Sequence, residues 1–168
     1  MEYRVRILPG RETIQKTAQD AGVVFDPEAT ELVLSLANAR NAMMAMVEAP
    51  LREEYGLTEG KFILLMALKS HPEGFGVKEL ADRVGVSVPT VSIMLRRILE
   101  SPEPLVTVSP DRKSGRGKRV RIAEPGVRLI RQVLPAHLGR VEAFSSRLTP
   151  DERRELVRLL GKLIQSRE

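Results

Sequence analysis

Residues 79–100, ELADRVGVSVPTVSIMLRRILE, carry the pattern that decides the fold. The stretch predicts a short helix that ends at Val84, a Gly-Val-Ser turn, and a second helix that begins after Ser87 and runs to about Glu100. Ser87 is a favourable N-cap, and Pro89 is tolerated in the first turn of a helix. Two helices joined by a short turn with a glycine are typical of a helix-turn-helix.

Two predicted strands around a basic loop follow this pair of helices. The strands are LVTV (105–108) and RVRI (119–122), and the loop between them, DRKSGRGK (111–118), is built of glycines and cations. Helix, turn, helix and a β-hairpin with a basic tip is the order of a winged helix-turn-helix. That module places one helix in the DNA major groove and a loop over the backbone or the minor groove.

The positive charge of the chain is concentrated in this region. Between Arg96 and Arg121 lie eight Lys or Arg residues and three acids, a balance of +5 that equals the formal net charge of all 168 residues. A basic loop is usually only a solvated surface. Its position directly after a helix-turn-helix pattern favours nucleic-acid binding instead.

The composition argues against several other classes of protein. Without cysteine the chain has no disulfide framework, no thiolate metal site and no thiol redox switch. No apolar run approaches the roughly 18 to 20 residues of a membrane span, and the first residues lack the features of a signal peptide, so we expect a cytoplasmic protein. The low aromatic content, with no tryptophan, disfavours stacking on single-stranded bases.

No residue pattern indicates an enzyme. His71 and His137 are far apart, and no cluster has the spacing of metal ligands. Ser92, Ser145 and Ser146 have no His and Asp partners in an order that suggests a nucleophile. We therefore expect no catalytic residue, no metal and no cofactor.

Helix signals lie on both sides of the winged module. Residues 26–28 (Asp-Pro-Glu) combine an N-cap, a proline at the first helical position and an acid in the first turn, and they predict a helix that ends near Pro50. Residues 123–125 begin a long helix to about Leu148, and a last helix capped by Thr149 follows. The fold class is therefore mainly α with a small β-hairpin wing.

Apolar residues in the two C-terminal helices suggest contacts beyond the winged module. In the long helix they recur at the alternating spacing of an a/d seam, and in the last helix they form a stripe. They are Val127, Ile130, Leu134, His137, Val141, Phe144 and Leu148, then Leu156, Leu159, Leu160, Leu163 and Ile164. Such helices can form an intrachain bundle or a homodimer. Because helix-turn-helix proteins commonly read two half-sites with two-fold symmetry, we expect the homodimer.

These signals divide the chain into four expected parts. They are an N-terminal extension with a short helix (1–26), an N-terminal dimerisation helix and linker (27–57), a winged helix-turn-helix DNA-binding domain (58–123) and C-terminal dimerisation helices (124–168).

Residues 79–92 and 116–122, with the flanking helices, resemble the MarR family of bacterial transcription regulators over roughly residues 27–166. The resemblance implies a homodimer with interlocked terminal helices, and a pocket between the dimerisation and DNA-binding parts that takes a small, frequently phenolic, anion. One departure concerns the wing. The family's acid near the wing tip falls at Ser114 here, with Asp111 three residues earlier, so the Asp–Arg pair that braces the family's wing has no positional counterpart.

The candidate DNA contacts lie on the second helix and on the hairpin. Val91, Leu95 and Ile98 recur at helical spacing and should face the core, which leaves other side chains for DNA. The candidates are Ser87, Pro89, Thr90, Ser92, Arg96 and Arg97 on the helix, and Arg112, Lys113, Arg116, Lys118 and Arg119 on the hairpin.

Some of these candidates have an alternative interpretation. Ser87 is equally well explained as a helix cap alone. Arg96 and Arg97 either hold phosphates or brace the wing through Asp111. Ile93, where the family often has a polar or basic residue, either touches a thymine methyl group or is simply an exposed apolar side chain.

The sequence therefore predicts a homodimeric, sequence-specific transcription regulator that binds a pseudo-palindromic operator in double-stranded DNA. We expect a repressor that a small-molecule effector releases, with Arg40, Met43 and Met44 as candidate ligand-binding residues; the methionines are otherwise core or interface packing. Two alternatives remain. One is an architectural winged-helix protein without an effector, and the other is a winged-helix module that binds other proteins.

Overall fold

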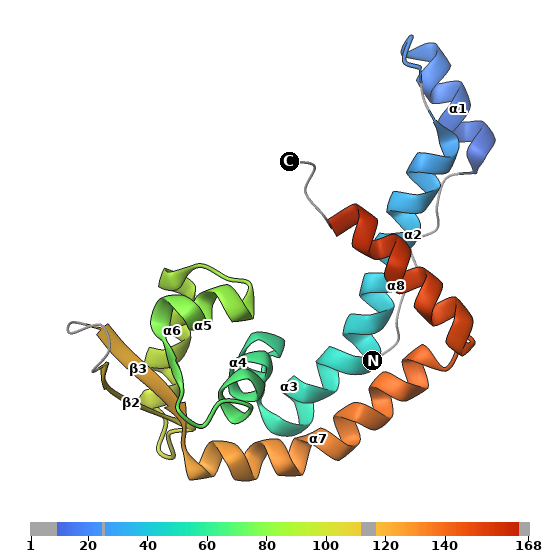
Figure 1. Cartoon of the computed structure of the whole chain (residues 1–168). Helices are drawn as coiled ribbons and strands as arrows, with labels where there is room; N and C mark the ends of the chain where they lie inside the picture. Colours follow the sequence, from blue (N-terminus) through green and yellow to red (C-terminus); the bar gives the residue numbers. More distant parts are fainter. Residues whose placement is uncertain (1–9, 25, 112–116, 165–168) are drawn as a thin grey trace. The chain divides into compact units, whose positions relative to one another are not determined.

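The computed structural model of the chain describes residues 10–24, 26–111 and 117–164 (Figure 1). Within these residues the elements, in chain order, are α1 (Arg11–Asp20), α2 (Pro27–Met43), η1 (Met44–Glu48), α3 (Ala49–Tyr55), α4 (Glu59–Lys69), β1 (Phe75–Gly76), α5 (Val77–Val84), α6 (Val88–Leu99), β2 (Val106–Asp111), β3 (Gly117–Ile122), α7 (Glu124–Ser145) and α8 (Pro150–Ile164). The chain divides into two compact units, one up to Pro50 and the other from Leu51 onward. The predicted class, mainly α with a small β wing, is confirmed.

The first long helix begins as predicted but does not end near Pro50. The carboxylate of Asp26 caps α2 by accepting a hydrogen bond from the backbone N–H of Glu28 (2.9 Å). A π-helical turn, η1, then precedes α3, which contains Pro50, and the N–H of Ala49 donates to the carbonyl of Met44. In a regular α-helix the proline ring would clash with the carbonyl four residues earlier. The wider π turn shifts the register just before the proline, and the helical backbone continues.

The helix-turn-helix formed by α5 and α6 agrees with the prediction. Gly85 ends α5 in the left-handed conformation (φ +71°), which glycine adopts at little cost. The hydroxyl of Ser87 accepts a hydrogen bond from the backbone N–H of Thr90 (3.3 Å) and so caps α6. Val91, Leu95 and Ile98 of α6 are buried, as their spacing predicted. The opposite side of α6 is left exposed.

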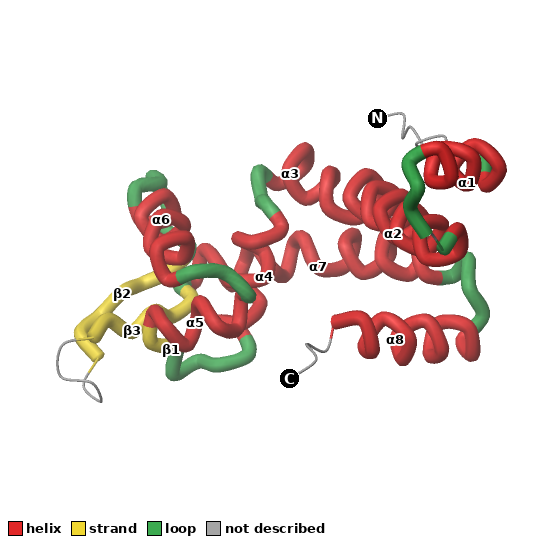
Figure 2. Tube along the Cα trace, turned by 90° about the horizontal axis from the view of Figure 1, so that it is seen from above, coloured by secondary structure: helices red, strands yellow, loops and turns green. Residues whose placement is uncertain are grey.

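The sheet has three antiparallel strands in the order β1-β3-β2. The hairpin of β2 and β3 forms the wing, with Val108 opposite Val120, and β1 adds a short pairing of Phe75 with Val120. The side chains of Val106 and Val120 are fully covered, which ties the wing to the core. Figure 2 shows the strands beside α5. The strands extend further toward the wing tip than the sequence predicted.

The predicted seam of the long helix α7 divides into two parts. Ile130 of the seam is completely buried in the same core as the apolar side of α4, together with Val133, which lies outside the predicted seam. The first half of α7 therefore packs within the chain. Val141, in the second half, is exposed. In α8 the predicted cap is present, because the backbone N–H of Thr149 donates to the carboxylate of Glu152 (2.7 Å). None of the helices that the described residues form is long and apolar enough to cross a membrane.

Two glycines of α7 test how closely this helix approaches the wing. A Cβ atom on Gly126 would lie 2.3 Å from the carbonyl oxygen of Leu105 and 2.9 Å from the side chain of Ile122, whereas one on Gly139 would meet nothing within 4 Å. We expect Gly126→Ala to lower the free energy of unfolding by about 1–3 kcal/mol through overpacking. Gly139→Ala should raise it by up to about 1 kcal/mol through helix propensity. Urea unfolding of both variants would measure this, and equal effects would contradict the close approach.

Candidate nucleic-acid interface

The exposed side of α6 carries all six candidate DNA contacts of the helix. Ser87, Pro89, Thr90, Ser92, Arg96 and Arg97 are exposed, and they lie on the helix whose other side is buried in the core. The hydroxyls of Ser87 and Thr90 are hydrogen-bonded to each other (2.8 Å). The hydroxyl of Ser92 donates to the carbonyl of Val88 (2.9 Å). The capping role of Ser87, one of its two predicted interpretations, is present in the structure.

A groove of about 320 Å³ between α6 and the wing brings three of the predicted residues together. Ser92 and Arg96 line it from α6, and Lys118 lines it from β3. The rest of its lining is mostly apolar and consists of Val77, Leu95, Leu99, Glu100 and Val108. The groove therefore combines two exposed cations, from helix and wing, with an apolar floor.

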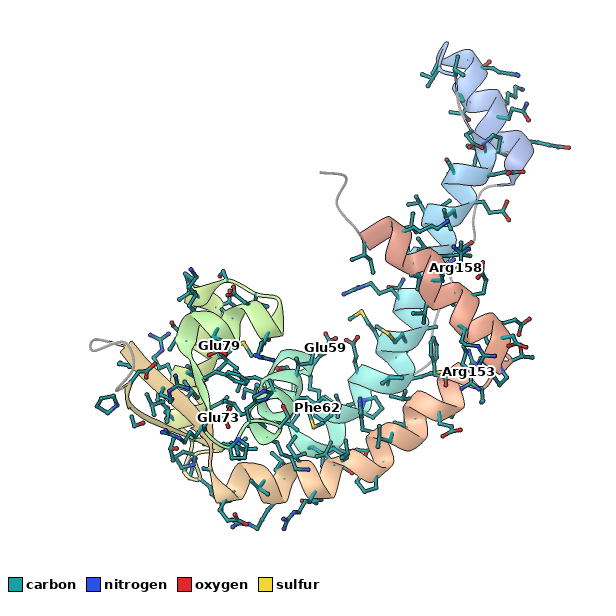
Figure 3. All side chains as sticks on the ribbon, in the orientation of Figure 1. Glu59, Phe62, Glu73, Glu79, Arg153 and Arg158 are labelled. Carbon is teal, nitrogen blue, oxygen red and sulfur yellow. The ribbon has the colours of Figure 1, made fainter. Side chains whose placement is uncertain are left out.

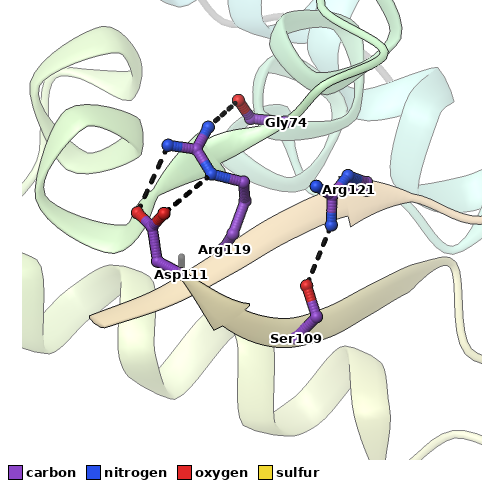
Figure 4. A network of polar contacts seen from close by, with 5 residues as sticks. All are labelled: Gly74, Ser109, Asp111, Arg119 and Arg121. Carbon is purple, nitrogen blue, oxygen red and sulfur yellow. Dashed lines mark hydrogen bonds and ion pairs between the residues drawn. The ribbon is translucent and has the colours of Figure 1, made fainter. Parts of the chain in front are cut away.

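A partly buried network braces the wing near the loop end of its two strands (Figure 4). The guanidinium of Arg119 on β3 donates from Nε and Nη2 to the two carboxylate oxygens of Asp111 on β2 (3.3 and 3.2 Å). Its third nitrogen, Nη1, donates to the carbonyl of Gly74 (2.7 Å), just before β1. The side chains of Arg119 and Asp111 are only 15% and 8% exposed. Beside them, Arg121 donates to the hydroxyl of Ser109 (2.9 Å).

The same network includes the backbone of Gly74, whose conformation requires glycine. Its φ of +74° lies in the left-handed region, and a Cβ atom there would lie 2.1 Å from the carbonyl oxygen of Val120. Only glycine fits this turn. The turn places the carbonyl of Gly74 within reach of Arg119, so three segments of the chain meet at one guanidinium.

A second polar cluster lies where α7 meets α3 and α4. The ring of His137 packs on the ring of Phe62 (labelled in Figure 3), with centroids 4.5 Å apart. Arg140 donates to the carboxylate of Glu54. Among the described residues, the buried His137 Nδ1 and Arg140 Nη1 have no hydrogen-bond partner. Burial lowers the pKa of His137 and the charge of Arg140 lowers it further, so the imidazole is neutral at neutral pH.

This cluster was only partly visible in the sequence. His137 was predicted on the helical seam, and in the structure it contacts Phe62 of the same chain. A place for it at a dimer interface stays a prediction. Arg140 was not singled out, although it follows His137 by one helical turn. Its partner Glu54 is 86 positions away in the sequence, a separation that no local pattern could bridge.

The three candidate ligand-binding residues lie in the unit that ends at Pro50. Arg40 is exposed on α2, while Met43 at the end of α2 and Met44 at the start of η1 are half-buried. The π-helical turn was not predicted, and such turns are frequent at functional sites. Ligand binding by these residues stays a prediction.

No family model matches the chain. The curated transcriptional repressor YetL of Bacillus subtilis (strain 168), of the helix-turn-helix type, is 27% identical over 144 residues, which cover 84% of this chain and 83% of YetL. Among solved structures, the MarR family transcriptional regulator Sco3205 from Streptomyces coelicolor, in complex with DNA, superposes with a TM-score of 0.76 at 20% identity over 85% of this chain and 91% of Sco3205. The chain has the MarR fold. BpsR of Bordetella bronchiseptica, whose DNA binding is regulated by 6-hydroxynicotinic acid, is also similar (TM-score 0.67, 21% identity, 80% and 99% covered).

Within the MarR fold, the wing of this chain is braced by Asp111 despite its displaced position. The sequence left open whether Arg96 or Arg97 would pair with this carboxylate, and in the structure Arg119 makes the brace. Arg119 was predicted to contact phosphate. That role stays a prediction, but all three of its nitrogens already donate to Asp111 and Gly74. Three further predicted contacts, Arg112, Lys113 and Arg116, lie outside the described residues, as does Ser114.

The brace can be tested by removing its charge without changing its shape. Asp111→Asn leaves the guanidinium of Arg119 partly buried without a counter-ion, so we expect the free energy of unfolding to fall by about 1–3 kcal/mol. The matched control is Arg128→Ala, which breaks the exposed ion pair with Glu103 and should cost less than about 1 kcal/mol. Urea unfolding and amide hydrogen exchange of β2 and β3 would measure both variants. Equal stability and unchanged exchange in Asp111→Asn would rule out the brace.

Proposed function

We propose that the chain is a MarR-type, homodimeric, sequence-specific DNA-binding transcription regulator that acts in the cytoplasm as a repressor. The observation that carries this proposal is the exposed side of α6 beside a braced wing, with exposed cations on both elements. Two similar proteins support it, since YetL is a repressor and Sco3205 was solved with DNA. A recognition helix in the major groove and a wing over the backbone would together hold one half-site.

In this proposal the contacts divide by chemistry. Ser87, Pro89, Thr90 and Ser92 lie near the N-terminus of α6, the part of a recognition helix that contacts base edges. Arg96, Arg97 and Lys118 supply positive charge for phosphates. At the wing tip, Arg112, Lys113 and Arg116 extend the contact along the backbone or into the minor groove.

The homodimer is proposed from apolar side chains that a single chain leaves uncovered. On α8, Leu156, Leu159 and Leu163 recur at helical spacing and are exposed. Exposed apolar patches of this kind mark interaction sites. A second copy of the chain would cover them, and a two-fold dimer would present two recognition helices to a pseudo-palindrome.

A small-molecule effector is proposed as the regulator of DNA binding. BpsR offers the precedent, because 6-hydroxynicotinic acid regulates its binding to DNA. Here Arg40, Met43 and Met44 are the proposed ligand-binding residues, with the cation for an anionic group and the methionines for an apolar one. An effector that binds one dimer geometry better than another shifts the population and releases DNA.

The DNA-binding proposal is tested by two substitutions on α6 that should differ in kind. Sites would first be selected from a random duplex library with the wild-type protein. Thr90→Ala should cost about 1–3 kcal/mol at its own site and relax the preference at one position of each half-site. Arg97→Ala should weaken all duplexes alike and reduce the slope of log affinity against log salt by about 0.9 for each phosphate that the protein no longer neutralises. Affinity would be measured on site variants at several salt concentrations.

The library also separates the proposal from its alternatives. A specific regulator binds its selected site several orders of magnitude more tightly than random duplex, whereas an architectural protein shows a small ratio. A protein-binding module would enrich no duplex at all. Uniform loss of affinity in both variants would mean that Thr90 does not face the bases.

The dimer is tested at an apolar residue that is exposed in the single chain. Leu163 is 58% exposed in the single chain, so Leu163→Asp should leave the fold intact but place an unpaired charge in the proposed interface. We expect a monomer by light scattering and a loss of binding to two-half-site DNA of about 100-fold or more, because linked half-sites bind far more strongly than one. Lys162→Glu, an acid at the neighbouring position off the stripe, is the control. A wild-type monomer that binds its site tightly would exclude the dimer.

A further inference from the structure

The outward side chains at the start of α6 divide into a locally bonded polar set and an unpartnered apolar set. The Ser87 and Thr90 hydroxyls bond to each other, and the backbone N–H of Thr90 donates to Ser87. Ser92 uses its only hydroxyl proton on the carbonyl of Val88. These short side chains therefore stay close to the helix backbone.

The apolar set is exposed on the first turns of the same helix. Val88 and Ile93 are 42% and 44% exposed, and Pro89 is exposed as well. Pro89 and Ile93 are four positions apart, so they lie on the same side of the helix. Ile93 is the longest of the three side chains, and its β-branch leaves it few rotamers. The first turns of α6 thus present a small apolar point, formed by Pro89 and Ile93, whose side chains have few rotamers.

Charges close by indicate what this apolar point meets. Arg96 and Arg97 are exposed on the next turn of α6, and Lys118 is exposed on the wing. Cations around a small apolar point fit a polyanion that carries isolated apolar groups. Duplex DNA has this chemistry, because in its major groove the 5-methyl group of thymine stands among phosphates and polar base edges.

We propose that Ile93, supported by Pro89, contacts the 5-methyl group of a thymine and thereby sets a thymine preference at one position of each half-site. This inference rests on the proposed function, since it needs α6 in the major groove. Cytosine has the same pyrimidine ring but no methyl group at C5, so the contact with Ile93 discriminates through one methyl group alone. 5-Methylcytosine at that position restores the contact.

The test removes the methyl group from the DNA and the isoleucine from the protein in turn. Full-length wild-type protein selects its site from a random duplex library, and each thymine of that site is then replaced singly by deoxyuridine. At the thymine that meets Ile93 we expect a loss of affinity of about three- to fivefold, the effect of one buried methyl group. Ile93→Ala should bind the methylated and unmethylated duplexes equally. Ile63→Ala, at a partly exposed isoleucine of α4 (36%), is the matched control and should keep the methyl dependence.

Each outcome decides the proposal. A methyl dependence that disappears in Ile93→Ala and persists in Ile63→Ala supports it. A dependence of equal size in wild type and Ile93→Ala overturns it, as does a site in which no thymine methyl matters, while specific DNA binding by the wild type keeps the proposed function intact. If the wild type enriches no duplex, the proposed function fails and the inference fails with it.

Discussion

The contacts of the Arg119 guanidinium are the interaction on which the winged helix-turn-helix depends. It joins β2 through Asp111, and through the carbonyl of Gly74 it joins the turn that leads into β1 and α5. A charge this well covered is stable only with its partners in place, because an unpaired buried charge is costly. Gly74 in turn admits no side chain, since Val120 lies too close. The wing is therefore fixed to the start of the helix-turn-helix by the side chain of one residue.

The second constraint is the entry of α7 into the core. Gly126 lets the helix pass against the carbonyl of Leu105, and Ile130 and Val133 then close the core over α4. The first half of α7 thus shares its core with the winged helix-turn-helix. α7 runs as one helix from Glu124 to Ser145, with Pro135 inside it, so a displacement of its far end is linked to the wing through a single element. A shift of the proposed dimer interface could change the position of α6 in this way.

Local signals made much of this fold predictable from the sequence. Gly85 and Ser87 bound the two helices of the helix-turn-helix, and the buried positions of α6 follow from their spacing. The features that could not be predicted depend on contacts between residues far apart in the sequence or on an unusual backbone conformation. The partner of Arg119 at Gly74 is 45 positions away, and Pro50 lies inside a helix because a π turn precedes it. In the candidate site, exposure of the α6 residues was predictable, but the structural use of Arg119 was not.

The brace between Arg119 and Asp111 also affects which side chains of α6 and the wing would supply affinity for DNA and which would supply sequence preference. With Arg119 engaged, the described cations left for DNA on α6 and the wing include Arg96, Arg97 and Lys118, which are long side chains suited to phosphates. Such contacts give affinity that falls with salt and carry no sequence information. The hydroxyls nearest the helix start are bonded locally, which weakens their use as donors to bases. Sequence preference then rests on few atoms. The longest exposed side chain on the first turns of α6, that of Ile93, is apolar. The methyl contact proposed for Ile93 depends on shape and not on charge, so this part of the sequence preference should persist at salt concentrations that already weaken the affinity.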